Sequence, residues 1–196
     1  MKKFILSTLS LILISLLISC NNKSLTIQKS IDAFFNKNSS NEKVDILLIK
    51  EIGNEKLILA HKLEKDGEQS TNLFLLNENN EILSWTSGQM PISQCFTVNT
   101  LIYNDKRIIF GSFNDSKYIP SEDKKIGVNI SKIDIILTAN KNICEDVSLD
   151  KGYLLVIDDS SDIQEVTILN NNNEIQSTLS DIDNIINQTD FIIYKK

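Results

Sequence analysis

The fold class is decided by residues 44–63, which read VDILLIKEIGNEKLILAHKL. Two runs rich in apolar and β-branched residues, Val44 to Ile52 and Lys56 to Leu63, flank the dipeptide Gly53-Asn54. β-branched side chains favour the pleated, half-buried surface of a strand. A Gly-Asn corner tolerates the positive φ angles that a tight turn between two strands needs. The stretch therefore predicts an antiparallel β-hairpin.

The same pattern continues along the chain, where turn-forming residues recur about every eight to twelve residues. The apolar runs cover residues 73–76, 82–86, 96–103, 107–113, 128–137, 153–157, 163–169 and 191–194. Too few helical patterns remain to connect parallel strands. We therefore predict a mainly β fold, an antiparallel sandwich or curled sheet of hairpins and meanders. Within it, we expect Tyr153 to Ile157 to be covered on both faces and Tyr118 to Lys125 to form a charged loop.

One short amphipathic helix is predicted before the strands, from about Ser24 to Asn36. Its apolar residues recur at the spacing of one helical face, and they are Ile27, Ile31, Phe34 and Phe35. Ser24 is placed to cap the first turn. We expect this helix to pack on the β domain or to lie near the membrane.

An internal repeat joins two distant parts of the chain. Residues 76–82 read LNENNEI and residues 169–175 read LNNNNEI, so six of seven positions match. Each copy lies between two apolar runs, and a further β run precedes each, at Leu57 to Ala60 and at Tyr153 to Ile157. A duplicated three-stranded meander, about 44–95 and 126–180, would explain the match. The alternative is convergence, because Asn tolerates the left-handed conformation that such turns need.

The amino terminus has the parts of an export signal: Lys2 and Lys3, then an apolar run from Phe4 to Ile18. The sequence Leu17-Ile18-Ser19-Cys20 resembles the lipobox of bacterial lipoproteins. That resemblance implies diacylglycerol on the Cys20 sulfur, cleavage before Cys20, and anchoring at the extracytoplasmic face of the cell membrane. The alternative is an uncleaved transmembrane anchor, although the run is shorter than the ~20 apolar residues that a span needs.

These features predict a signal peptide over 1–19, a lipidated Cys20 with a tether and short helix over 20–40, and a single β-rich extracytoplasmic domain over 41–196. With 41% hydrophobic and 23% charged residues, the chain can bury an ordinary core. The net charge is −6 overall. After cleavage, 18 basic and 26 acidic residues remain, a net charge of −8. Such a surface argues against nucleic acid as a partner.

The hairpins supply a second resemblance, in residues 100–113 (TLIYNDKRIIFGSF), 152–157 (GYLLVI) and 163–169 (IQEVTIL). Together with the lipobox and the short helix, they resemble small uncharacterised lipoproteins of low-GC Gram-positive bacteria. The likeness covers most of the chain and is one of pattern. It carries over no catalytic residues.

Candidates for chemistry are few. His61 is the only histidine. It stands in a predicted strand, where a surface-facing side chain is expected, and no G-x-S-x-G motif accompanies it. Asp158, Asp159 and Asp162 resemble calcium ligands in composition but lack the Gly and the distant Glu of an EF-hand loop, so we interpret them as a solvated turn. We expect no metal site, no cofactor and no catalytic residue.

Two further sets have a functional and a structural interpretation. The first set is three scattered carboxylates, Asp181, Asp183 and Asp190. They could serve sugar hydrolysis only if a cleft brought two of them together. Aromatic residues at strand positions could line a groove for a glycan or a peptide. Aromatic residues in strands more often belong to the core. The residues of this set are Trp85, Tyr103, Phe110, Phe113 and Tyr118.

The two cysteines that remain once Cys20 is lipidated are Cys95 and Cys144. Each lies at the margin of a predicted strand beside polar turn sequence. Outside the cytoplasm, two thiols that come close enough can form a lasting disulfide. We predict a Cys95–Cys144 bridge, and the alternative is two buried thiols that act as small apolar side chains.

Three functional hypotheses follow. The first is a lipid-anchored envelope protein with a non-catalytic binding or structural role, attached to the membrane through Cys20 and able to meet an envelope protein or a glycan. The second is a carboxylate-dependent hydrolase of cell-wall or other sugars. The third is an inhibitor or immunity lipoprotein that acts on one protein partner. A cleft with two convergent carboxylates would favour the second, and an exposed apolar patch would favour the third.

Overall fold

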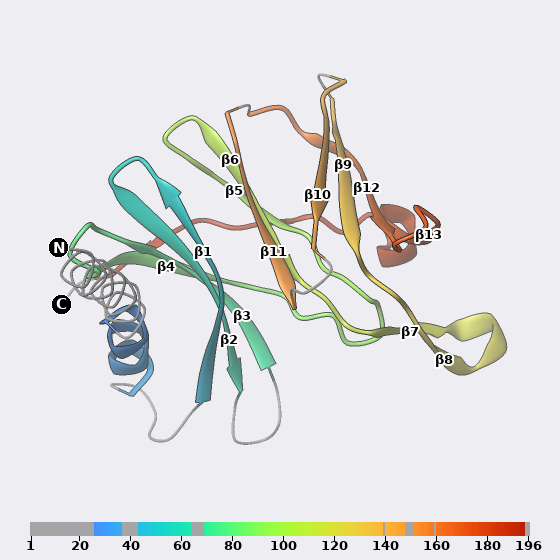
Figure 1. Ribbon diagram of the computed structural model, residues 1–196, viewed down its shortest axis with the longest axis horizontal. Coiled ribbons are helices and arrows are strands. Elements are labelled where there is room, and N and C mark those ends of the chain that lie inside the picture. The colour runs from blue at the N-terminus through green and yellow to red at the C-terminus, as the bar shows by residue number, and fades with distance from the viewer. Residues whose placement is uncertain are drawn as a thin grey trace, which may run out of the picture.

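The computed structural model describes residues 26–36, 43–63, 69–138, 140–147, 151–158 and 160–194. It is mainly β, with several antiparallel sheets and one helix near the amino terminus, over residues 26–36, as the sequence predicts (Figure 1). Cys20 and the predicted signal peptide lie outside the described residues. None of the helical segments in the described part has the length and apolar character that crossing a bilayer requires.

The first sheet has the order β1-β2-β3-β4-β15. Its strands are β1 (Lys43–Ile52), β2 (Glu55–Leu63), β3 (Gln69–Leu76), β4 (Ile82–Gly88) and β15 (Ile192–Ile193). The predicted β1–β2 hairpin is present, with Gly53 at the positive φ of 63° that its turn requires. The helix covers one face of this sheet. Its four predicted apolar residues are all buried there, in a cluster that includes Ile58 and Phe74.

The second sheet has the order β11-β6-β5-β14. Its strands are β5 (Asn99–Tyr103), β6 (Lys106–Ser112), β11 (Gly152–Ile157) and β14 (Asn187–Gln188). One face packs on the first sheet through a core that holds Leu59, Leu73, Ile108 and Phe110. Most of β11 is buried, in agreement with the expectation for Tyr153 to Ile157.

The third sheet has the order β10-β9-β12-β13. Its strands are β9 (Lys132–Leu137), β10 (Asn142–Asp146), β12 (Ile163–Leu169) and β13 (Ile175–Thr178). It shares a second core with the other face of the second sheet, where Ile109, Tyr153, Ile135 and Val166 meet. Two cores thus lie on either side of the central sheet, and apolar side chains fill both.

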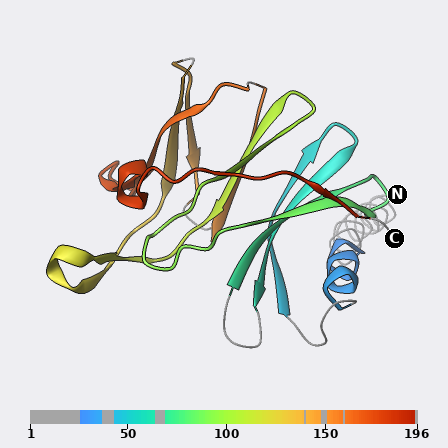
Figure 2. The same ribbon diagram turned by 180° about the vertical axis from the view of Figure 1, so that it is seen from behind.

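The segment from Tyr118 to Lys125 is not the loop that its charge suggests. It belongs to a two-stranded hairpin, β7 (Ser116–Ile119) and β8 (Lys124–Gly127), joined by the 3-10 turn η1 (Pro120–Glu122). This hairpin projects from the body, at the end of the molecule opposite the helix (Figure 2). Pairing between backbone groups does not depend on side-chain polarity, so the apolar pattern could not reveal these strands.

The meander that contains the second Asn-rich turn differs from the predicted one in its first strand. β11 pairs with β6 in the second sheet, and β12 pairs with β9. The strand that corresponds to β2 is therefore β9 (Lys132–Leu137) and not Tyr153 to Ile157. Chain order suggested β11 because it precedes β12 directly, but a buried strand pairs where both of its faces can be covered.

Candidate functional site

Three adjoining hollows share the segment Gln89–Gln94, which connects β4 to β5. The largest, about 880 Å³, lies between this segment and Gln69. A second, about 140 Å³, reaches Lys117 and Tyr118 on β7. The third, about 40 Å³, extends to Val98 and Asn187. We call this region the loop site, and we define it as Gln89–Gln94 with the three hollows beside it.

Hydrogen bonds fix the loop to its surroundings. The Gln89 N–H donates to Asn99 Oδ1 at 3.1 Å, and Thr97 Oγ1 donates to the Gln89 carbonyl at 3.1 Å. Further along, the Tyr118 N–H donates to the Ser93 carbonyl at 2.7 Å. Gly88 precedes the loop, where a Cβ atom would lie 2.6 Å from the Asn99 side chain. The loop is therefore held between β5 and β7 and is not a free tip.

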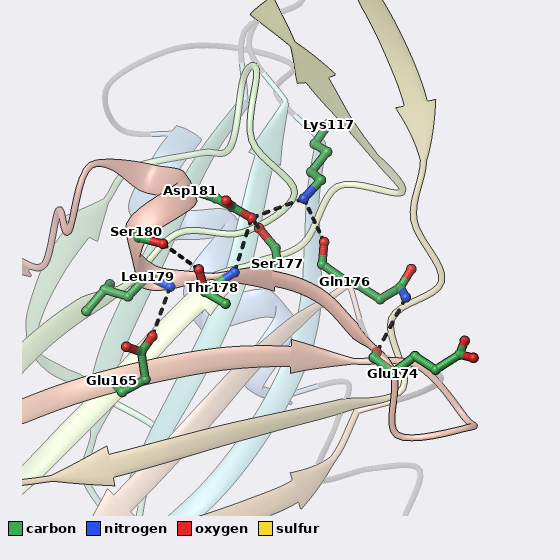
Figure 3. A network of polar contacts seen from close by, with 9 residues as sticks. All are labelled: Lys117, Glu165, Glu174, Gln176, Ser177, Thr178, Leu179, Ser180 and Asp181. Carbon is green, nitrogen blue, oxygen red and sulfur yellow. Dashed lines mark hydrogen bonds and ion pairs between the residues drawn. The ribbon is translucent and has the colours of Figure 1, made fainter. Parts of the chain in front are cut away.

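An ion pair between the mostly buried Lys117 and the more exposed Asp181 lines the second hollow, and Figure 3 shows its contacts. Lys117 Nζ lies 3.0 Å from Asp181 Oδ2 and donates to the Gln176 carbonyl at 2.7 Å. The Ser177 hydroxyl donates to the same Asp181 oxygen at 2.7 Å. The Lys117 side chain is only 18% exposed. The pair therefore joins the projecting hairpin to the end of β13.

The carboxylate of Asp181 is held in its ionised form. Burial acts to raise its pKa, but the Ser177 hydroxyl, the Lys117 ammonium and the Thr178 N–H together hold the pKa below its usual value. The Thr178 N–H lies 3.2 Å from Asp181 Oδ2 in a capping box at the start of η2 (Leu179–Ile182). A second carboxylate supports the same turn, because the Leu179 N–H donates to Glu165 Oε1 at 3.3 Å (Figure 3).

Cys95 lies beneath this network and is fully buried. Burial raises the pKa of its thiol, although a hydrogen bond with Ser177 acts in the opposite direction. The thiol is therefore protonated at neutral pH and is a poor nucleophile. The predicted bridge to Cys144 is absent from the structure. Both cysteines are free, and Cys144 is exposed on β10, so the two thiols lie in different environments.

His61 does not face solvent as the sequence suggested. It is half-buried and crosses from β2 to the second sheet, where its Nε2 lies 2.7 Å from the Ser112 hydroxyl of β6. Thr71 forms a short hydrogen bond with the same hydroxyl. Burial, and then the nearby Lys151, lower the His61 pKa, while Asp45 acts to raise it. Ser112 is fully buried, so this pair serves to link two sheets and offers no accessible nucleophile.

The aspartates of the predicted turn have separate partners. Asp162 Oδ1 lies 3.0 Å from Nη2 of Arg107, a residue only 6% exposed. Asp158 pairs with Lys106, and the hydrogen bond from that lysine lowers the Asp158 pKa. Asp159 lies outside the described residues. Within the described ranges, no three or more His, Cys, Asp or Glu side chains are grouped so that they could hold a metal ion.

The remaining candidates are spread over the molecule. Asp183 caps η2, and Asp190 lines a separate hollow beside β5. Of the five aromatic candidates, Tyr118 lines a hollow of the loop site and is 41% exposed. The other four pack within or against the cores, namely Trp85, Tyr103, Phe110 and Phe113. Sequence reasoning missed the loop site because its residues come from four separate segments.

The architecture is mainly antiparallel β, with one core on each face of the central sheet. Comparisons with protein-family models, with curated proteins and with solved structures found no match for this chain.

Proposed function

We propose that the chain is a lipid-anchored, extracytoplasmic binding protein that performs no catalytic step. Cys20 would hold it to the cell membrane, and the loop site would meet the ligand. The observation that carries the proposal is the position of the three hollows, which adjoin one another around a single fixed loop. Binding sites are concave and pre-formed, with a few polar groups that orient the ligand.

Two of the carboxylates, Asp158 and Asp181, lack the property that the hydrolase alternative requires. A glycoside hydrolase needs one carboxylic acid whose pKa is raised, so that it stays protonated and can donate to the leaving group. Asp158 and Asp181 both have lowered pKa values because cations and N–H or O–H groups stabilise their ionised forms. Each is therefore suited to holding structure and unsuited to acting as a general acid.

The lining of the loop site indicates the class of ligand. It offers amide and hydroxyl groups from Gln69, Gln89, Gln94 and Ser93 and the exposed ring of Tyr118, and apolar side chains also line the largest hollow, namely Met90, Pro91 and Ile92. The one ionic pair in the second hollow is internally neutralised. Amides and hydroxyls with an aromatic face suit an uncharged, hydroxyl-rich ligand, and we propose an envelope glycan.

A protein partner is the second candidate, as the inhibitor or immunity hypothesis requires. One observation favours it: the side chain of Ile92, in the middle of the loop, is 87% exposed. An exposed apolar side chain beside a concave surface is typical of an anchor at a protein interface.

The test is co-sedimentation of the detergent-solubilised full chain with purified cell-wall glycan. We expect binding by the wild type and a loss of about tenfold in affinity, or ~1.4 kcal/mol, in Tyr118→Ala. Ile49→Ser is the matched control, because Ile49 is 45% exposed on β1, away from the loop site. Wild-type binding that Tyr118→Ala leaves intact would contradict the assigned site. Binding that Ile92→Ser weakens and Tyr118→Ala does not, together with capture of one envelope protein, would favour the second candidate. Release of sugar fragments would show a hydrolase.

A further inference from the structure

The carboxyl-terminal strand β15 exposes two adjacent isoleucines at an edge of the first sheet. Ile192 is 56% exposed and Ile193 is 73% exposed. Among the described strands it pairs with β4 alone, where Ile192 is opposite Trp85 and Ile193 is opposite Ser84. Apolar side chains on an open sheet edge favour contact with another surface.

The next residue ties this edge to the helix. The Tyr194 ring lies 5.1 Å from the ring of Phe34, and Phe34 also contacts Trp85 at 5.3 Å. With a rise of about 1.5 Å per residue, Phe34 lies about 12 Å along the helix axis from its first described residue, Thr26. The edge strand therefore packs beside the last turn of the described helix, and the start of that helix lies about 12 Å further along its axis.

The length of chain before the helix limits how far this region can be from the anchor. Five residues, 21–25, separate Cys20 from Thr26. An extended chain spans at most about 3.6 Å per residue, so these residues reach about 20 Å. If Cys20 carries lipid in the bilayer, the start of the helix stays within about 20 Å of the membrane surface and β15, beside Phe34, within about 30 Å. This step rests on the proposed anchoring.

We propose that β15 is a membrane-contact edge, in which Ile192 and Ile193 rest in the interface of the bilayer. Apolar side chains gain free energy there. Lys195 and Lys196 follow Tyr194 in the sequence, and lysines are attracted to the anionic surface of a membrane. The lipid supplies the affinity, because it makes the second contact intramolecular.

The contact would set the orientation of the whole domain. The helix and β15 lie at one end of the longest axis, and the β7–β8 hairpin lies at the other (Figure 1). Tyr118 and Lys117 of the loop site belong to that hairpin. With β15 on the bilayer, this part of the loop site points away from the membrane, toward an envelope ligand.

Trp85 provides a built-in reporter, because it is the only tryptophan and the cross-strand partner of Ile192. The experiment reconstitutes the full lipidated protein in phosphatidylcholine–phosphatidylglycerol vesicles whose acyl chains carry bromine near the headgroup. We expect these vesicles to quench Trp85 emission relative to unbrominated vesicles. The double variant Ile192→Ser/Ile193→Ser should lose most of that quenching and keep the same thermal unfolding. In the control variant Ile175→Ser, which alters an isoleucine that is 65% exposed in the third sheet, Trp85 emission should be quenched as strongly as in the wild type.

Mass spectrometry of Cys20, made before the vesicles are added, separates the two proposals. A Cys20 without lipid would overturn the anchoring and this inference with it. A lipidated protein whose Trp85 is not quenched would overturn the contact and leave the anchoring intact. Unchanged quenching in the double variant would assign the contact to another surface. Concentration-dependent dimers that the double variant abolishes would show that a second copy covers the edge, and would also overturn it.

Discussion

The Asn-rich turn between β3 and β4 and the turn between β12 and β13 are the same structure in two places. The first residues, Asn77 and Asn170, donate their N–H groups to the carbonyls of Glu81 and Glu174, each at 3.0 Å. Each Asn Oδ1 accepts from the N–H groups two and four residues later, at 2.9–3.0 Å. Each Asn Nδ2 donates to the Glu carboxylate, at 3.0 and 2.7 Å.

The likeness extends to the neighbouring strand. Asn80 and Asn173 have φ angles of 61° and 60°. A lysine from the adjacent strand donates to the Oδ1 of each, Lys56 at 2.5 Å and Lys132 at 2.7 Å. These lysines occupy equivalent register positions, opposite residues 76 and 169. The local unit is therefore three strands and one turn, and in the second copy its first strand is β9 instead of the predicted Tyr153 to Ile157.

The two meanders differ in what covers them. In the first, Phe74 is opposite both Ile58 and Trp85, under the helix. In the second, Thr167 is opposite both Asp134 and Thr178, which are only half-buried. Ile82 after the first turn is 8% exposed, whereas Ile175 after the second is 65% exposed. The turn is thus a local property of its residues, and burial is decided by the helix.

The largest expected effect is a difference in stability loss between a variant in the first meander, which the helix covers, and a variant in the second, which is open. Phe74→Ala removes a fully buried ring from beneath the helix and should lower the free energy of unfolding by about 3–5 kcal/mol. Thr167→Ala is the matched variant and should change it by no more than about 0.5 kcal/mol. Urea unfolding of the full chain measures both. Equal losses would mean that the helix does not cover the first meander in solution.

Sequence reasoning reached the parts of the fold that depend on neighbours in the chain. The β1–β2 hairpin, the apolar helix face and the paired turns all follow from residues a few positions apart. It did not reach the partner of β11 or the Lys117–Asp181 pair, because those contacts join segments far apart in the chain. Cys95 and Cys144 show the same limit, since strand margins do not reveal which side chains converge.

Removing the first asparagine of each Asn-rich turn should lower the free energy of unfolding by the same amount. Asn77→Ala and Asn170→Ala each remove the solvent-exposed side-chain hydrogen bonds that close the turn, so each should cost about 1 kcal/mol. Because the contacts are the same in both turns, the two losses should agree. Urea unfolding of both variants under identical conditions makes the comparison. A loss confined to Asn77→Ala would show that the turns differ in energy despite their matching geometry.

A smaller effect concerns His61. When the two meanders are aligned on Lys56 and Lys132, His61 of β2 corresponds to the buried Leu137 of β9. Because burial and Lys151 lower the His61 pKa, the folded protein binds fewer protons than the unfolded chain near that pKa. The associated stability is complete above the ordinary pKa of 6.5 and is lost as the pH falls below it. Asp181 and Asp158, whose pKa values are lowered from 3.8, add losses only at more acidic pH.

The measurement is the free energy of unfolding at pH 7 and at about pH 5, for the wild type and for His61→Asn. We expect the wild type to lose stability over this interval and the variant to lose less of it. Parallel curves for the two proteins would remove His61 from the pH dependence.

The central claim is that the same turn structure occurs in a meander that the helix covers and in one that is open. Native-state amide hydrogen exchange tests this claim most directly. The amides of Glu81 and Glu174, which bond within their own turns, should exchange at similar rates. The amide of Phe74, in the strand beneath the helix, should exchange far more slowly than that of Thr167. Equal protection of Phe74 and Thr167, together with different rates at the two glutamates, would contradict the account.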